Sequence, residues 1–509
     1  MKKSIKIIML CMVLAVLALA IAACTGNGGG TPVATPTPTP ADPTPTPAPT
    51  PEPTPTPEPE AAAPDFPDLG GRVVTMAGTP ASIQQFLGRF SDDDGFIEPD
   101  PMADDYNIRR RQWDNRLRVE EAFNITIEAR TIAAFSSIDR VRMATMAGEV
   151  YADFIGDDPW GIFTCMINDY LVPFEGLTAM LPGDLALDVL TTQLNAWPQI
   201  TFHGETFALG VPRFAFNPWG ILINLDVIES VGAPNPVTLY ENGEWTWEAL
   251  RNIIEMSTQD LTGDGNMDIF GLAGGLNELL RHMIVANGEW LADPYTFELG
   301  LTTPAGMMAV EFVYDILRNG WWIPADPEHN HPTLHSSINI NLFADGRFAL
   351  AVGAVGAING TRDLGAEFAL DWVPFPVGPM NNDNYVMDIW PVTPVGIVDG
   401  AEDPHYLLWI LDELWAWAEG ERYEFHLEAT FDNLRGFAPT EATVQRVIRT
   451  VLENSRMEYA SIANLINPFL RDIQTEWWNG TMTPAQSIEH FGPARVEHIR
   501  NYFGMETEE

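Results

Sequence analysis

Polar and aromatic side chains gather directly after one strand-like run in the sequence. Asp157, Asp158 and Trp160 follow the run Ala152 to Ile155 within a few positions. Carboxylates accept hydrogen bonds from hydroxyl or amine groups, and an indole ring stacks on the apolar face of a sugar. The same two aspartates precede Pro159, where an acidic residue caps a helix N-terminus equally well. The sequence therefore leaves ligand contact and helix capping open for both aspartates.

Tryptophan is abundant, with 16 residues in the chain. Most of these rings must fill the core, and Trp409 and Trp415 lie in a helical pattern that indicates packing. Trp219 and Trp390 instead fall at strand ends or in connecting segments, and Asp388 adds a hydrogen-bond acceptor beside Trp390. The sequence predicts a ligand site formed by Asp157, Asp158, Trp160, Trp219, Asp388 and Trp390.

An acidic loop resembles the calcium-binding loop of an EF-hand. Oxygen-bearing side chains recur along it, and Gly265 occupies the sixth position, where the turn is sharp. The twelfth position holds Gly271 instead of the usual bidentate glutamate, so a loop stabilised by its own Asx turns is the alternative. The pattern predicts a structural calcium ion bound by Asp260, Thr262, Asp264, Asn266 and Asp268.

Motifs for covalent catalysis are absent from the sequence. It has no Gly-x-Ser-x-Gly, no phosphate-binding glycine loop followed by Lys and Ser or Thr, no His-Glu-x-x-His and no Cys-x-x-Cys. His329, His331 and His335 could supply metal ligands, but their segment has the composition of a polar loop. We therefore expect no enzyme and no required cofactor. The alternative is a glycoside hydrolase, because acidic residues are numerous enough to supply its carboxylate pair.

The elements that must position these residues alternate between strand and helix patterns. Such alternation predicts an α/β lobe with a largely parallel sheet. In open sheets of this kind ligands bind at the carboxyl ends of the strands, which is where Asp157 and Trp160 fall. The expected strands are 73–77, 125–129 and 152–155, and the expected helices are 106–123, 138–147 and 160–168.

The N-terminus has the pattern of a secretory leader. Lys2, Lys3 and Lys6 precede an apolar run from Ile7 to Ala23, and Cys24 follows two alanines. This junction resembles the bacterial lipobox, which implies that residues 1–23 form a lipoprotein signal peptide and that Cys24 carries a lipid. An uncleaved anchor helix is the alternative, and both place the body outside the cytoplasm.

A proline-rich linker separates the leader from the body. Residues 24–64 would be the lipidated N-terminus and a linker of Thr-Pro, Ala-Pro and Glu-Pro repeats, which favour an extended polyproline II form. At about 3.1 Å per residue such a linker would hold the body roughly 100 Å from a membrane. The body, residues 65–509, contains only Cys165, so no intrachain disulfide is available to it.

Charge excludes one class of partner. Lys and Arg number 27 against 70 Asp and Glu, which gives a net charge of −43. A surface this acidic repels phosphate backbones, so nucleic acid is not an expected partner. The acidity could reflect cationic ligands, but a solvated acidic surface that favours solubility explains it more simply.

Several segments, in order, resemble family 1 extracellular solute-binding proteins. Residues 152–155 with Tyr170-Leu171-Val172-Pro173-Phe174 resemble the family's strand and "gYLvPL" turn. Five further matches continue along the chain: the "dGktYalP" hairpin at 203–212, the "g-l-yYNkdlf" segment at 219–228, the "tWdel" helix start at 245–250 with Thr246 as N-cap, and the segments 342–350 and 371–379. The chain departs from the family in lacking the usual lysines, and 353–356 are Gly-Ala-Val-Gly where sugar-binding relatives often carry an aromatic residue.

The resemblance implies an α/β, two-lobed, type II periplasmic-binding-protein-like fold with a ligand cleft between lobes. Each lobe would be a mostly parallel sheet flanked by helices. The first lobe is expected to comprise about 69–213 plus 347–399, and the second about 214–346 plus 400–505.

The resemblance also implies a function. It is that of a monomeric, lipid-anchored receptor on the extracellular face of the cell membrane, which delivers a small-molecule solute to the permease subunits of an ABC importer. A sugar is favoured as the solute because of the aromatic side chains, and peptides or polyamines are alternatives because of the carboxylates. A surface glycoside hydrolase and an adhesive or sensory protein are the competing functions.

Overall fold

The computed structural model describes the body of the chain. The described residues are 66–103, 106–181, 199–210, 218–293, 295–322, 343–381, 384–388, 394–415, 431, 434–436, 438–456, 458 and 464–503. The chain divides between Pro64 and Asp65. The expected leader, Cys24, the proline-rich linker, the three clustered histidines and Trp390 lie outside the described residues.

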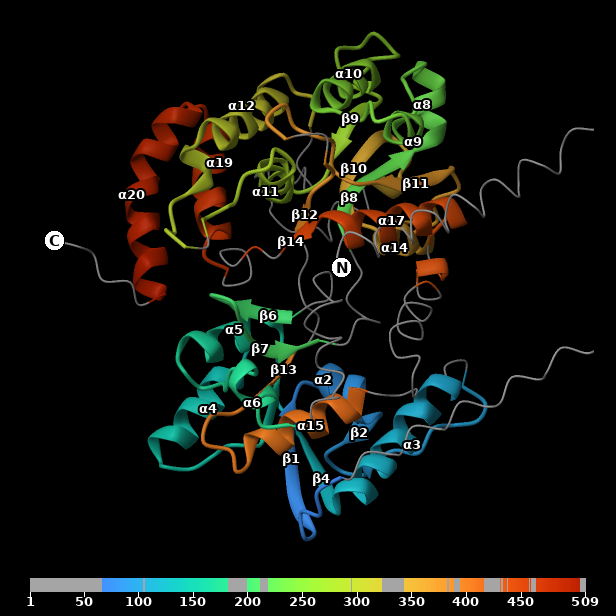
Figure 1. Cartoon of the computed structure of the whole chain (residues 1–509). Coiled ribbons are helices and arrows are strands. Elements are labelled where there is room, and N and C mark those ends of the chain that lie inside the picture. The colour runs from blue at the N-terminus through green and yellow to red at the C-terminus, as the bar shows by residue number, and fades with distance from the viewer. Residues whose placement is uncertain are drawn as a thin grey trace, which may run out of the picture. The chain divides into compact units, whose positions relative to one another are not determined.

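A six-stranded sheet organises what we call the first lobe (Figure 1). Its order is β4-β1-β5-β13-β7-β6. β1 pairs in parallel with β4 and with β5, so the carboxyl ends of these three strands lie at one edge. β13 is antiparallel to both β5 and β7. The strands are β1 (Arg72–Gly78), β4 (Ile125–Thr131), β5 (Phe154–Gly156), β6 (Gln199–Phe202), β7 (Glu205–Leu209) and β13 (Val395–Ile397).

Helices and a short hairpin pack on the first sheet. The side-chain amide of Asn115 in α3 donates to the main-chain oxygens of Glu413 (2.9 Å) and Leu414 (3.1 Å) in α15, which ties these two helices together. The elements are α2 (Pro80–Leu87), the hairpin of β2 (Phe90–Ser91) and β3 (Gly95–Phe96), α3 (Tyr106–Phe123), α4 (Ser137–Met146), α5 (Pro159–Ile167), α6 (Glu175–Thr178) and α15 (Pro404–Trp415).

A four-stranded sheet organises the second lobe, in the order β11-β8-β10-β9. β8 runs antiparallel to both of its neighbours, and β10 is parallel to β9. Ala354 at the end of β10 pairs with Trp219 at the start of β8, so Trp219 lies at the carboxyl edge of the parallel pair. The strands are β8 (Trp219–Asn224), β9 (Phe270–Ala273), β10 (Phe348–Ala354) and β11 (Leu370–Val373).

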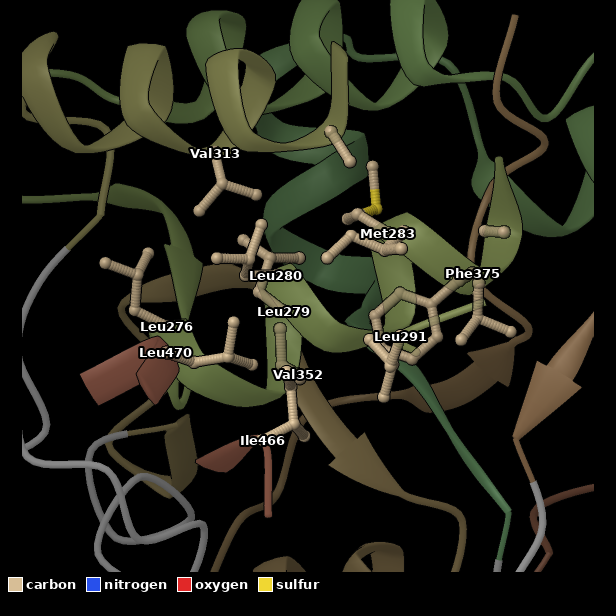
Figure 2. Close-up of a cluster of buried hydrophobic side chains, with 14 of the residues drawn as sticks. Leu276, Leu279, Leu280, Met283, Leu291, Val313, Val352, Phe375, Ile466 and Leu470 are labelled. Carbon is tan, nitrogen blue, oxygen red and sulfur yellow. The ribbon is translucent and has the colours of Figure 1, made fainter. Parts of the chain in front are cut away.

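The core of the second lobe is built around α11, which is buried on almost every side. Figure 2 shows leucines of this helix meeting Val313 of α12, Val352 of β10 and Leu470 of α19. Each fully buried leucine contributes about 1.5–3 kcal/mol. The helices are α8 (Leu225–Val231), α9 (Pro236–Glu241), α10 (Trp247–Ser257), α11 (Leu276–Ala286), the 3-10 turn η2 (Gly300–Thr302), α12 (Pro304–Arg318), α14 (Ala357–Asp363), α17 (Glu441–Asn454), α19 (Asn467–Asn479) and α20 (Pro484–Tyr502).

Two smaller contacts complete the structure. β12 (Met387–Asp388) pairs with β14 (Ser455–Arg456), next to α11. At the end of α20, Phe503 stacks on Phe202, with ring centroids 5.6 Å apart, and thereby anchors the last helix. None of the helices within the described ranges combines the length and the apolar composition that crossing a membrane requires.

Local expectations are confirmed, and two long-range ones are wrong. The expected helix 106–123 is α3, and Thr246 caps α10 by accepting from the main-chain N–H of Ala249 (3.3 Å). Both sheets are mixed rather than mostly parallel. β10 and β11, expected in the first lobe, pair with β8 in the second sheet, whereas α15, expected in the second lobe, packs on α3. A strand pattern in the sequence does not specify its partner, because the pairing bonds join distant residues.

Candidate functional site

The start of α5 lies at the carboxyl edge of the first sheet, where β5 ends at Gly156. Asp158 is the N-cap, and its Oδ1 accepts from the main-chain N–H groups of Trp160 (2.9 Å) and Gly161 (3.2 Å). Burial and, after it, the neighbouring charge of Asp157 together raise the pKa of this carboxyl to about 6. Asp158 therefore caps the helix, which is one of the two roles that the sequence left open for it.

Asp157 holds the loop between β4 and α4. Its carboxylate is fully buried and accepts from the main-chain N–H groups of Phe135 (3.0 Å), Ser137 (3.0 Å) and Asp158 (2.8 Å). A Cβ at Gly161 would lie 2.6 Å from its Oδ2, so only glycine lets the helix approach this closely. A carboxylate so enclosed has no face open to a solute, and its observed role is structural. Ligand contact was the other expectation for Asp157, and in this conformation the carboxylate is too deeply buried for a solute to reach it.

Two aromatic rings stand beside these carboxylates. Trp160 is half-buried, and its ring centroid lies 6.0 Å from that of Phe135, with an angle of 56° between the planes. Phe135 is 59% exposed. Asp157, Asp158 and Trp160 lie together as near neighbours in the sequence, and the structure adds Phe135 from a different loop.

Trp219 packs on the second lobe beside α11. Its ring stacks on His282 at a centroid distance of 5.9 Å, and His282 stacks on Phe375 at 4.6 Å. Burial, reinforced by the neighbouring Arg281, holds the pKa of His282 well below its usual value, so this ring is neutral. His282 Nδ1 lies 2.8 Å from the main-chain oxygen of Glu278, and Nε2 has no hydrogen-bond partner among the residues that the structure describes.

Asp388 reaches the same helix from β12. Its buried carboxylate lies 3.8 Å from the Nε of Arg281, and Arg281 also pairs with Glu278 (2.8 Å). Trp219 and Asp388 thus contact consecutive residues of α11. Asp388 was expected to be an acceptor for solute hydroxyls, but only 3% of the residue is exposed, so in this conformation it faces its ion pair instead.

A second buried carboxylate adjoins this group. Glu458 Oε1 accepts from Arg456 (2.8 Å) and Oε2 from the main-chain N–H of Leu291 (3.0 Å). Burial raises the pKa of Glu458 to about 7, against the opposing effect of Arg456. Charge pairing and main-chain donors account for this cluster as part of the packing around β12 and β14.

The expected calcium loop folds on its own hydrogen bonds. Asp260 accepts from the N–H groups of Gly263 (2.7 Å) and Gly265 (2.8 Å), and Asp268 accepts from Leu261 (2.8 Å) and Thr262 (2.9 Å). The main-chain donors lower the pKa of Asp260, so it is charged at neutral pH.

Metal ligands do not converge in this loop. Within the described ranges, no three His, Cys, Asp or Glu side chains gather closely enough to hold a metal ion. Calcium would require the loop carboxylates to turn toward a common point, so the site stays a prediction.

Sequence reasoning missed Phe135, Arg281 and Glu458. A signal existed for Phe135, since it follows β4 at the edge where Asp157 follows β5, and a large apolar residue there is conspicuous between small and polar neighbours. Arg281 and Glu458 gave no such signal, because they meet Asp388 only through tertiary contacts.

Comparison with known proteins yields matches to solved structures. Neither a family model nor a curated protein sequence matches the chain. The cyclic α-maltosyl-1,6-maltose binding protein of Arthrobacter globiformis aligns at 13% identity with a TM-score of 0.57, over 85% of this chain and 100% of that one. The maltose/maltodextrin-binding domain of Bdellovibrio bacteriovorus, bound to maltotriose, aligns at 13% identity and 0.52, over 84% and 100%. A Listeria monocytogenes ABC substrate-binding protein, in complex with cycloalternan, aligns at 12% identity and 0.52, over 86% and 100%.

These alignments establish the fold. The chain has the two-lobed α/β architecture of type II periplasmic binding proteins, and the alignments cover 85–86% of it. At this level of identity the likeness extends to the fold and not to the residues that contact a ligand.

Proposed function

We propose that the chain is an extracellular solute receptor that delivers an oligosaccharide to an ABC importer. The observation that carries the proposal is the type II binding-protein fold together with an aromatic pair at the carboxyl edge of its first sheet. The solved neighbours are sugar-binding proteins by name, and aromatic rings at this edge are the groups that stack on sugars. Closure of a hinge around the solute would present a surface to the permease.

The anchor and the location belong to the same proposal. Lipidation at Cys24 would tether the protein to the outer face of the cell membrane, with residues 24–64 as the spacer and the body acting as a monomer. A calcium ion at the loop 260–268 would be structural and separate from solute binding.

The carboxylates at the start of α5 do not form the catalytic pair of a glycoside hydrolase. A carboxyl with a pKa of about 6 could serve as a general acid, but both of its oxygens already accept main-chain N–H groups, from Trp160, Gly161 and Phe135. Its neighbour Asp157 is enclosed in the same way. The pair therefore lacks the free faces that general acid and nucleophile require.

Calorimetric titration of the full chain tests the proposal. The ligands are maltotriose, maltotetraose, cycloalternan and a chitin oligosaccharide, with peptides and polyamines as the alternative classes. Binding of an oligosaccharide without release of shorter products is the expected result. Hydrolysis would establish the glycosidase, and binding of only a peptide or polyamine would replace the solute class.

Two tryptophans discriminate a binding face from packing. Trp160→Ala should weaken binding by about 1–3 kcal/mol, as truncation of a buried aromatic anchor does, while the fold survives. Trp390→Ala is predicted to behave in the same way. Loss of about 3–5 kcal/mol of folding stability with unchanged affinity would instead assign these rings to the core.

A further inference from the structure

Phe135 combines two features that rarely occur together. It is 59% exposed, although phenylalanine is usually buried. Its backbone is left-handed, with φ at 64°, a region that glycine and asparagine adopt readily and that is strained for a bulky residue. Neither burial nor local propensity explains a phenylalanine here, so packing does not account for the choice of residue.

The loop that carries Phe135 is held firmly. The N–H of Phe135 donates both to Asp157 Oδ1 (3.0 Å) and to Asp158 Oδ2 (3.1 Å). The hydroxyl of Ser136 donates to the main-chain oxygen of Ala133 (2.6 Å), and the N–H of Ser137 donates to Asp157 Oδ2 (3.0 Å). Two carboxylates thus hold the backbone that carries the exposed ring, although placing them side by side carries an electrostatic cost.

The ring lies where a solute is expected to bind. Ile132, which follows β4, donates its N–H to the oxygen of Gly78 at the end of β1 (2.9 Å), so the loop continues the carboxyl edge of the parallel strands. Trp160 starts the helix that follows β5 at the same edge, and its ring lies 6.0 Å from that of Phe135. Two tilted rings from two different loops therefore form one aromatic surface.

The surroundings of the pair suit a saccharide. Asp92 is an exposed carboxylate that accepts from the main-chain N–H of Thr131 (3.0 Å), four residues before Phe135. The hydroxyl of Thr131 donates to Asp92 and that of Ser136 donates to the main-chain oxygen of Ala133, so both keep the capacity to accept. An apolar surface on a stretch of chain that carries acceptors matches a sugar ring, which presents C–H groups on its faces and hydroxyls at its rim.

We infer that Phe135 is a ligand-contacting residue that stacks on a sugar ring of an oligosaccharide, next to Trp160, and that Asp157 and Asp158 are positioning residues for it. This inference rests on the proposed function and names part of its site. It also reverses the expected roles, because the carboxylates hold the aromatic ring and the ring, rather than the carboxylates, meets the solute.

Three variants of Phe135 in the full chain test the inference. Each is titrated calorimetrically with whichever of maltotriose, maltotetraose, cycloalternan and chitin oligosaccharide the unmodified protein binds most tightly. Phe135→Leu keeps an apolar side chain but removes the flat ring, and Phe135→Asn removes the ring while suiting the left-handed backbone. Phe135→Trp is the matched control, since it retains a flat ring.

Phe135→Leu and Phe135→Asn should each weaken binding roughly tenfold to a hundredfold, whereas Phe135→Trp should stay within about threefold of the unmodified protein. The urea midpoint of Phe135→Asn should equal or exceed that of the unmodified protein, because asparagine relieves the backbone strain. A variant that is no less stable and yet binds less tightly separates ligand contact from a structural role.

Two results would overturn the inference and leave the proposed function intact: affinity within twofold for both Phe135→Leu and Phe135→Asn, or weaker binding only in variants whose urea midpoint falls. If the unmodified protein binds none of the four oligosaccharides, the proposed function and the inference fail together.

Discussion

Replacement of Asp157 by alanine is the sharpest test of the arrangement at the start of α5. The buried carboxylate accepts three main-chain N–H groups. Phe135 keeps a second acceptor in Asp158, but the N–H groups of Ser137 and Asp158 lose theirs. A buried donor without a partner costs about 1–3 kcal/mol, so the two together cost about 2–6 kcal/mol.

An opposing effect reduces this cost. Removing the charge of Asp157 relieves its repulsion of Asp158, and the pKa of Asp158 should fall from about 6 toward its ordinary value. Asp158 is partly exposed, so solvent screens this interaction and the relief amounts to about 1 kcal/mol. The expected net loss of folding free energy for Asp157→Ala is about 3 kcal/mol.

Urea unfolding followed by circular dichroism measures the loss, with equal m-values as the condition for comparing midpoints. Asp93→Ala is the matched control, since it removes an exposed carboxylate of the same lobe and should change stability by less than about 0.5 kcal/mol. A loss below about 1 kcal/mol for Asp157→Ala would refute the structural role. Weaker sugar binding at full stability would show instead that Asp157 serves the binding site, by positioning Phe135 or by contacting the solute, and does not stabilise the fold.

Three further predictions concern separate parts of the chain. The carboxyl of Asp158 has a raised pKa in the folded state, so the protein loses stability as pH rises from the unfolded-state pKa through about 6. Asp158→Asn lacks this titration and should therefore gain about 1 kcal/mol of stability relative to the unmodified protein between pH 4 and pH 7.5. Equal pH profiles in urea unfolding would contradict this. If calcium binds at Asp260, Asp264 and Asp268, millimolar calcium should raise the melting temperature above that measured in chelator without changing solute selectivity. At a calcium concentration 100 times Kd the gain in folding free energy is about 2.7 kcal/mol. Coincident melting curves would disprove the site. Cys24→Ala should abolish labelling by a palmitate analogue in the producing cell, and persistent labelling would disprove the anchor.

Elements that depend on near neighbours were predictable from the sequence. The helix α3 begins and ends where its periodicity and flanking residues indicate. Asp158 and Thr246 cap α5 and α10 through bonds to residues two or three positions away, so these contacts are encoded locally. Asp157, Asp158 and Trp160 are near neighbours in the sequence, and the rule that ligands bind at the carboxyl ends of strands singled out that edge.

Contacts between distant residues were not predictable in the same way. The neighbours of β10 are set by bonds such as the pairing of Leu350 with Ile223, and nothing in the strand pattern of β10 names that partner. The burial of Asp388 likewise results from Arg281, more than a hundred positions earlier. The lobe boundary and the role of Asp388 were therefore the points at which sequence reasoning went wrong or remained open.

The sequence by itself determined the class of fold, the local elements and their caps, and the edge of the first sheet at which aromatic and acidic groups meet, because hydrogen bonds over a few residues and hydrophobic periodicity fix these features. Only the tertiary structure decided what each group at that edge does. Asp157 lies beside a loop some twenty residues earlier, so its oxygens are taken by the N–H groups of Phe135 and Ser137. These bonds hold the backbone of a loop whose Phe135 is 59% exposed, since a buried carboxylate must accept hydrogen bonds from the donors that the fold brings to it.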